Sequence, residues 1–163
     1  MDLYILRHGR AEEHGHGGGD AARKLTKKGR EEIAAVGAWM AAHDLAFDLI
    51  AASPLVRAQE TAAIVAEILE TPDTIVTWNV LVPGGSPDDV CREVDTHAKA
   101  GAVLLVGHEP LLSTLIGRII AGDDGAGIVM TKGGLAKIRN FSFHRRPSGE
   151  LHWLLTAKQM MLP

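Results

Sequence analysis

The stretch Leu3-Tyr4-Ile5-Leu6-Arg7-His8-Gly9 decides the fold, because an apolar run passes directly into an arginine and a histidine. A short apolar run of this kind is typical of a strand that is buried on both faces, as the strands of parallel sheets are. The arrangement recurs twice, where Leu49–Ala52 precedes Ser53-Pro54 and where Val103–Val106 precedes Gly107-His108-Glu109-Pro110. The sequence therefore predicts buried strands that are each followed by polar residues.

Longer segments with the apolar spacing of helices separate these strands. In the first of them Ile33, Val36 and Met40 share one face, and Thr26 is a suitable N-cap. Serine before proline is typical of a helix start, so Ser53 is the expected N-cap of the next helix. The expected helices run from Thr26 to about Ala42, Pro54 to about Leu69, Asp88 to Lys99 and Leu111 to Ala121.

The alternation of strands and helices predicts an α/β fold, a three-layer sandwich with a mainly parallel central sheet flanked by helices. Further strands are expected at Ile75–Trp78, Ala136–Phe143 and Leu151–Thr156. The last two are joined by the predicted turn Arg146–Gly149 and should run antiparallel to each other. The 163 residues are 46% hydrophobic and contain no internal repeat, so we expect one domain over residues 1–163.

Composition argues against several classes of protein. The formal net charge is -3 with both signs interspersed, which disfavours nucleic acid and anionic membranes as partners. No apolar run approaches the roughly 18–20 residues that span a bilayer, and the N-terminus does not resemble a signal peptide. The single cysteine, Cys91, excludes an internal disulfide and a paired-cysteine zinc site. We therefore expect a protein of the cytoplasm.

Two arginines and two histidines follow the predicted strands, and they are the candidate site. Ligands of open α/β sheets bind beyond the carboxyl ends of the strands, so Arg7, His8, Arg57 and His108 should converge at one edge. Guanidinium groups match the oxygens of a phosphoryl group, and Arg57 lies in the first turn of a predicted helix. A neutral imidazole is a competent nucleophile near neutral pH. These residues therefore indicate phosphoryl transfer to His8, and His108, if it is protonated, would be a further charged donor.

The same residues resemble the histidine phosphatase superfamily, which has the phosphoglycerate-mutase-like fold. The resemblance rests on four blocks in order: Leu6–Gly9, Leu25–Gly29, Ser53–Thr61 and Val106–Pro110. It implies His8 as the nucleophile, Arg7, Arg57 and His108 as ligands of the phosphoryl group, and a mechanism without metal or cofactor. The short chain, Arg10-Ala11-Glu12 and Lys132-Gly133-Gly134 are similar to the SixA-type branch. Members of that branch are phosphohistidine phosphatases that act on histidine-phosphotransfer proteins, which would make such a protein the partner.

One departure from the family bears on the substrate. Many members carry a carboxylate between the arginine and the second histidine that protonates the leaving group, but Trp78–Gly85 contains no acid. An alkoxide needs such a donor, whereas imidazole leaves more readily. The sequence thus favours phosphohistidine over a small phosphorylated metabolite, such as a sugar or organic-acid phosphate. That metabolite phosphatase is the alternative, and a non-enzymatic binder of phosphoproteins is a more distant one.

Other polar residues have simpler interpretations. Asp88 and Asp89 are expected to start a helix rather than to donate a proton, and Ser53 is expected to cap one. His14 and His16 lie in the glycine-rich segment His14–Asp20, which we expect to be a mobile surface loop. Two histidines without a third ligand make a poor metal site.

Overall fold

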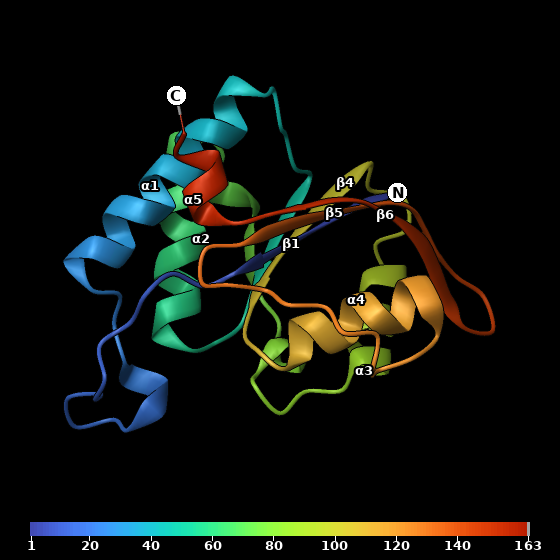
Figure 1. Ribbon diagram of the computed structural model, residues 1–163, viewed down its shortest axis with the longest axis horizontal. Coiled ribbons are helices and arrows are strands. Elements are labelled where there is room, and N and C mark those ends of the chain that lie inside the picture. Colours follow the sequence, from blue (N-terminus) through green and yellow to red (C-terminus); the bar gives the residue numbers. More distant parts are fainter. Residues whose placement is uncertain (163) are drawn as a thin grey trace.

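The computed structural model describes residues 1–162 and contains one six-stranded sheet with helices on both faces (Figure 1). The strands are β1 (Asp2–Arg7), β2 (Leu49–Ala52), β3 (Ile75–Thr77), β4 (Ala102–Gly107), β5 (Leu135–Phe143) and β6 (Pro147–Leu155). Their order across the sheet is β3-β2-β4-β1-β5-β6. The pairs β3–β2, β2–β4 and β4–β1 are parallel, while β1–β5 and β5–β6 are antiparallel. The predicted α/β class, the mainly parallel sheet and the final antiparallel pair are confirmed.

Alternation along β1 explains why both faces of the sheet are covered. Leu3 and Ile5 point into one core, and Tyr4 and Leu6 point into the other. The first core is closed by α3 (Pro87–Asp95) and α4 (Leu111–Ala121). The second is closed by α1 (Lys27–Ala42), α2 (Val56–Ile68) and the short α5 (Ala157–Met160). Three layers result, as predicted, with α3 and α4 on the opposite side of the sheet from α1, α2 and α5 (Figure 1).

Several predicted boundaries are wrong for local reasons. Ser53 is not the N-cap of α2, which begins two residues later than expected, at Val56, with Leu55 at the N-cap position. Helix α3 ends at Asp95 instead of Lys99, because the chain continues as a turn in which the Thr96 hydroxyl donates to Glu93 O at 2.6 Å. Strand β6 already begins at Pro147, so the connecting turn lies earlier than predicted. Proline is tolerated there because it opens an edge strand.

No helix within residues 1–162 combines the length and the apolar character that a membrane crossing requires. The glycine-rich segment has no helix or strand over residues 14–19, and a short 3-10 helix at Asp20–Ala22 begins at its last residue. That helix carries Asp20 toward the N-terminal end of α2, where the backbone carbonyl and the carboxylate of Asp20 contact Arg57.

Candidate active site

Three parallel strands end at the same edge of the sheet and bring the candidate residues together. Leu6 of β1 pairs with Val106 of β4, and Ala52 of β2 pairs with Val106 from the other side. The backbone N–H of His8 continues this pairing and donates to Gly107 O at 3.0 Å. The residues that follow each strand are therefore neighbours, and the ring centroids of His8 and His108 lie 4.9 Å apart.

Gly9 is required by packing between the end of β1 and helix α1. A Cβ atom at Gly9 would lie 2.7 Å from the side chain of Ile33 and 3.2 Å from the carbonyl oxygen of Gly29. The Gly9 N–H donates to the Thr61 hydroxyl at 3.1 Å, and that hydroxyl donates to Arg57 O at 2.7 Å. Thr61 thus links the segment after His8 to the helix that carries Arg57.

The hydrogen bonds of His8 define which ring nitrogen is free to react. Nδ1 lies 2.7 Å from Gly9 O, so it carries the proton and donates. Nε2 is then unprotonated, and it accepts from Arg57 Nε at 3.4 Å. The side chain is only 6% exposed, and its lone pair on Nε2 is held beside a guanidinium group.

His108 is held through the opposite nitrogen. Its Nε2 lies 2.8 Å from the Ser53 hydroxyl, which itself accepts from the Leu55 N–H at 3.3 Å. Because the Leu55 N–H occupies one lone pair of the Ser53 oxygen, the hydroxyl is placed to donate its proton to His108 Nε2. The imidazole proton then lies on Nδ1. Nδ1 is buried and has no partner within residues 1–162. Ser53 therefore orients the second histidine instead of capping a helix.

The two arginines differ in how much of their hydrogen-bonding capacity is already used. Arg57 donates to the carbonyl and carboxylate oxygens of Asp20 at 2.9 and 3.1 Å. Arg7 donates through Nη1 to Met130 O at 2.8 Å, while its buried Nε has no partner among the described residues. Burial lowers the pKa of Arg7, and the nearby Glu109 carboxylate acts in the opposite direction. Arg7 Nε and His108 Nδ1 are two buried polar atoms that a bound anion would satisfy.

These side chains line a pocket of about 370 Å³. It contains all four candidate residues, namely Arg7, His8, Arg57 and His108, together with Asp20, Arg23, Pro83, Glu109 and Lys132. Four cationic side chains face two carboxylates there, so the pocket is positively charged and suits a dianion. Asp20, Arg23, Glu109 and Lys132 were not predicted as site residues. Only the position of Glu109 beside His108 and the resemblance around Lys132 pointed toward the site.

Both histidines are neutral at ordinary pH. Burial lowers the pKa of His8 to about 3, and the positive charges of Arg57 and Arg7 act in the same direction. Burial, followed by the charge of Arg57, lowers the pKa of His108 to about 4. The sequence left the charge of His108 open, and in this environment the side chain is a neutral donor. His8 has an unprotonated nitrogen across the whole neutral range.

Comparison with known proteins identifies the family. The model of the histidine phosphatase superfamily (branch 1) matches residues 3–81, which include His8 and Arg57. An uncharacterized protein of Picosynechococcus is 31% identical over 167 residues, covering 100% of both chains. The chain belongs to the histidine phosphatase superfamily. Phosphohistidine phosphatase SixA of Escherichia coli is 26% identical over 125 residues, 76% of each chain.

The fold of this histidine phosphatase is also that of SixA. A solved structure of protein histidine phosphatase SixA complexed with tungstate superposes with a TM-score of 0.86 at 22% identity, covering 98% of this chain and 99% of the other. Together with the sequence match, this assigns the chain to the SixA-type branch. The chain is a phosphatase.

The remaining sequence candidates lie outside the pocket of the histidine phosphatase. Asp88 and Asp89 are in the first turn of α3, where Asp88 pairs with Arg118 and Asp89 with Arg92. Cys91 is buried in the core, and burial raises the pKa of its thiol to about 12. His14 and His16 are exposed. Within the part of the chain that is described, no three His, Cys, Asp or Glu side chains gather as a metal site would require.

Proposed function

We propose that this phosphatase hydrolyses phosphohistidine on a histidine-phosphotransfer protein through a phosphoryl group carried on His8. The observation that supports it most is the state of His8, whose Nε2 is unprotonated and faces Arg57. A neutral nitrogen fixed in this way attacks phosphorus without a separate base. The low pKa, about 3, maintains the nucleophilic form at every pH near neutrality.

The phosphoryl group is held by the surrounding donors. In this proposal Arg57 moves some of its hydrogen bonds from Asp20 to phosphoryl oxygens, and Arg7 offers its unpartnered Nε. His108 contributes a neutral donor at Nδ1, oriented by Ser53. Donors that are fixed before the reaction stabilise the charge of the transferring group without reorganisation.

The leaving group explains why phosphohistidine fits this pocket. When the second ring nitrogen of phosphohistidine is protonated, the ring is an imidazolium cation, and cleavage of its P–N bond releases neutral imidazole without a general acid. The Arg23 and Arg57 side chains lower the pKa of Asp20, which keeps this carboxyl ionised and unsuited to protonating an alkoxide. His8 Nε2 forms the new P–N bond as the substrate imidazole takes the electron pair of the old one.

The second step is chemically a repeat of the first. Phosphorylated His8 retains the proton on Nδ1, where Gly9 O accepts it, so His8 is itself a neutral leaving group. Water attacks phosphorus, the electron pair returns to His8 Nε2, and inorganic phosphate departs with both protons of the water molecule. No metal enters either step of this proposal, and activity in excess chelator tests that directly.

A small-metabolite phosphomonoesterase is the second candidate. Glu109 lines the pocket and accepts from the Ser113 N–H through one oxygen, Oε1, at 2.8 Å. If this carboxyl were protonated, its other oxygen would donate the proton to an alkoxide leaving group. Glu109→Gln separates the two functions, because it should slow hydrolysis of a sugar phosphate and leave that of phosphohistidine nearly unchanged.

The test measures phosphate release from a phosphohistidine-bearing phosphotransfer domain and from a sugar phosphate, in chelator, with His8→Ala as the control. Release from the domain that disappears in the variant supports the proposal. Preference for the sugar phosphate would retain His8 as nucleophile but favour the metabolite phosphatase. Tight binding of the phosphorylated domain without release would mean a binding protein instead of an enzyme.

A further inference from the structure

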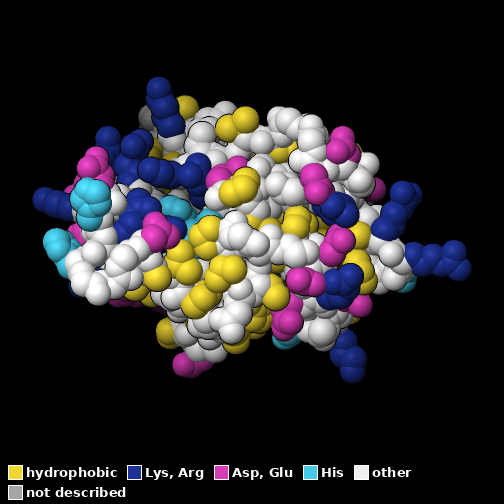
Figure 2. Space-filling view, turned by 90° about the horizontal axis from the view of Figure 1, so that it is seen from below, with side chains coloured by type: hydrophobic (Ala, Val, Ile, Leu, Met, Phe, Trp, Pro, Cys, Tyr) yellow, Lys and Arg dark blue, Asp and Glu magenta, His cyan; other side chains and the backbone are white. Residues whose placement is uncertain are grey.

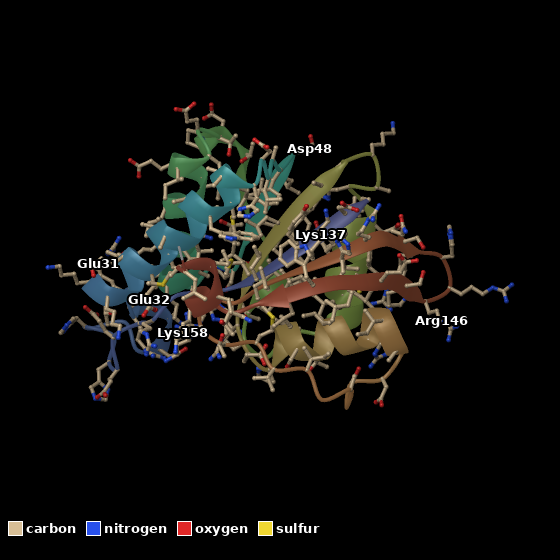
Figure 3. The ribbon with its side chains drawn as sticks, turned by 45° about the horizontal axis from the view of Figure 1, so that its top comes forward. Glu31, Glu32, Asp48, Lys137, Arg146 and Lys158 are labelled. Carbon is tan, nitrogen blue, oxygen red and sulfur yellow. The ribbon has the colours of Figure 1, made fainter. Side chains whose placement is uncertain are left out.

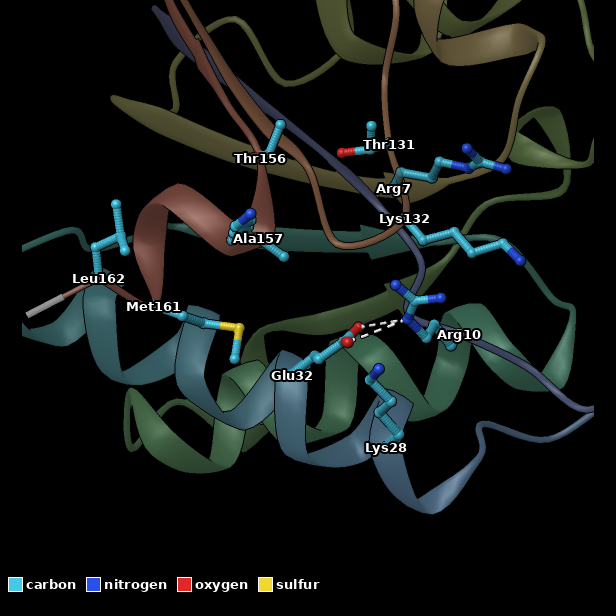
Figure 4. A pocket seen from close by; sticks show the side chains of 11 residues that line it. Arg7, Arg10, Lys28, Glu32, Thr131, Lys132, Thr156, Ala157, Met161 and Leu162 are labelled. Carbon is cyan, nitrogen blue, oxygen red and sulfur yellow. Dashed lines mark hydrogen bonds and ion pairs between the residues drawn. The ribbon is translucent and has the colours of Figure 1, made fainter.

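Beside the catalytic pocket lies a larger groove, of about 830 Å³, which the reaction at His8 does not use. It shares Arg7 and Lys132 with the pocket, so the two are continuous. We call it the basic groove and define it by Arg10, Lys28, Lys132, Lys158, Met161 and Leu162. Figure 4 shows that the groove is lined by the segment after β1, by α1, by the loop before β5 and by the residues that follow α5.

Positive charge dominates the groove near the catalytic pocket. Arg10 is joined to the Glu32 carboxylate through Nε, with both oxygens at 3.1 Å, and its terminal nitrogens point away from that carboxylate (Figure 4). Lys28, Lys132 and Lys158 make no side-chain hydrogen bond or salt bridge within residues 1–162. Lys and Arg side chains gather at this end of the molecule, to the left in Figure 2. The carboxylate of Glu32 is therefore outnumbered in the groove by the unpaired charges of Lys28, Lys132 and Lys158.

The far end of the groove is apolar. Met161 is 49% exposed and Leu162 is 65% exposed, and they are two of the three large hydrophobic side chains exposed in the described part of the chain. Ala157 also lines the groove, although most of its side chain is packed in the core. A patch of this kind beside a charged surface is typical of a protein-binding site.

We propose that the basic groove binds an acidic segment of the phosphorylated partner protein next to its phosphohistidine, with carboxylates on Lys28 and Lys158 and an apolar side chain on Met161 and Leu162. This proposal rests on the proposed function. The phosphoryl group is transferred inside the 370 Å³ pocket, so a substrate must extend beyond that pocket to use the groove. A polyanionic backbone such as nucleic acid would leave the apolar end unused and would meet Glu32, which makes an acidic, partly apolar polypeptide the better match.

The experiment compares two synthetic peptides that each carry one phosphohistidine and differ only in having glutamate or glutamine at the flanking positions. We expect kcat/KM to be about fivefold to tenfold higher for the glutamate peptide at low ionic strength, as two rim ion pairs predict. The preference should shrink in 0.5 M NaCl because salt screens exposed charges. Equal rates with both peptides at low salt would overturn the proposal.

Matched variants assign the effect to the groove. Lys28→Gln with Lys158→Gln removes two charges from it, while Lys99→Gln with Arg146→Gln removes two exposed charges elsewhere. Figure 3 shows Lys158 and Arg146 at opposite ends of the molecule. The first pair should abolish the glutamate preference and the second should preserve it. A preference that survives the first pair, or disappears in both, would overturn the proposal. Failure to hydrolyse either peptide would instead count against the proposed function.

Discussion

The two histidines of the active site occupy equivalent positions after parallel strands, yet they are held through opposite ring nitrogens. His8 is fixed through Nδ1 by a backbone carbonyl, which leaves Nε2 as a lone pair. His108 is fixed through Nε2 by the Ser53 hydroxyl, which leaves Nδ1 as a donor. Both are buried and neutral. The difference teaches that the partner of each ring, rather than its charge, makes one histidine suited to attack and the other to hydrogen bonding.

Replacing His8 should have the largest effect on activity. His8→Ala removes the nucleophile, so turnover of a phosphohistidine substrate should fall by about 10⁴-fold or more. His108→Gln removes only a donor and should cost about 10²- to 10³-fold. Single-turnover phosphate release measures both. Equal losses in the two variants would contradict the division of roles.

The buried neutral histidines should make stability depend on pH. The unfolded chain protonates each near pH 6.5, whereas the folded chain does so only near pH 3 for His8 and pH 4 for His108. The free energy of unfolding should therefore fall as pH decreases from about 6.5 toward 4, by up to about 1.4 kcal/mol per pH unit for each histidine. Urea denaturation at several pH values measures this slope. His8→Asn should reduce this slope by about half, whereas the exposed control His152→Asn should leave it unchanged. An unchanged slope in His8→Asn would mean that His8 is not buried in its neutral form.

Loss of the Ser53 hydroxyl should change the tautomer of His108. In Ser53→Ala the proton is no longer directed to Nδ1, and kcat should fall by about tenfold, in line with one lost buried hydrogen bond. The ¹⁵N shifts of the His108 ring provide a readout that a purely structural role would not change. If the variant lost activity while those shifts stayed the same, Ser53 would act through packing alone.

Asp20 should have the smallest effect. Its carboxylate competes with an anion for Arg57, but the side chain is 60% exposed and the ion pair is correspondingly weak. Asp20→Asn should tighten competitive inhibition by vanadate about twofold to fivefold. Asp124→Asn, which alters an exposed ion pair with Arg118, is the matched control. Weaker inhibition in Asp20→Asn would instead make Asp20 part of the anion site.

Where sequence patterns were strong, the fold was predictable. The bounds of β2 and α4 agree with expectation residue for residue, because each is a clear apolar pattern bounded by polar, proline or glycine residues. The end of α3 was not predictable, because Thr96 closes a turn through a hydrogen bond that apolar spacing does not encode. Similarly, β6 begins at Pro147 because an edge strand needs no donor from that residue.

The site was only partly accessible from sequence. Arg7, His8, Arg57 and His108 follow predicted strands, so topology alone brings them to one edge. Asp20 ends a glycine-rich segment without periodicity and Arg23 follows it, and their place in the same pocket as Arg57 depends on tertiary packing. Ser53 was assigned to the nearest helix because a local cap is the simplest partner for a serine, whereas its actual partner is 55 residues away.

The most direct test of the central claim is to trap the phosphorylated enzyme. A phosphohistidine-bearing phosphotransfer domain is mixed with the enzyme, quenched in alkali within the first turnover, and the peptides are analysed by mass spectrometry. The account predicts a transient phosphoryl group on His8 that appears before inorganic phosphate and is absent in His8→Ala. Phosphate released with no label on His8 at any time, or with the label on another residue, would contradict it.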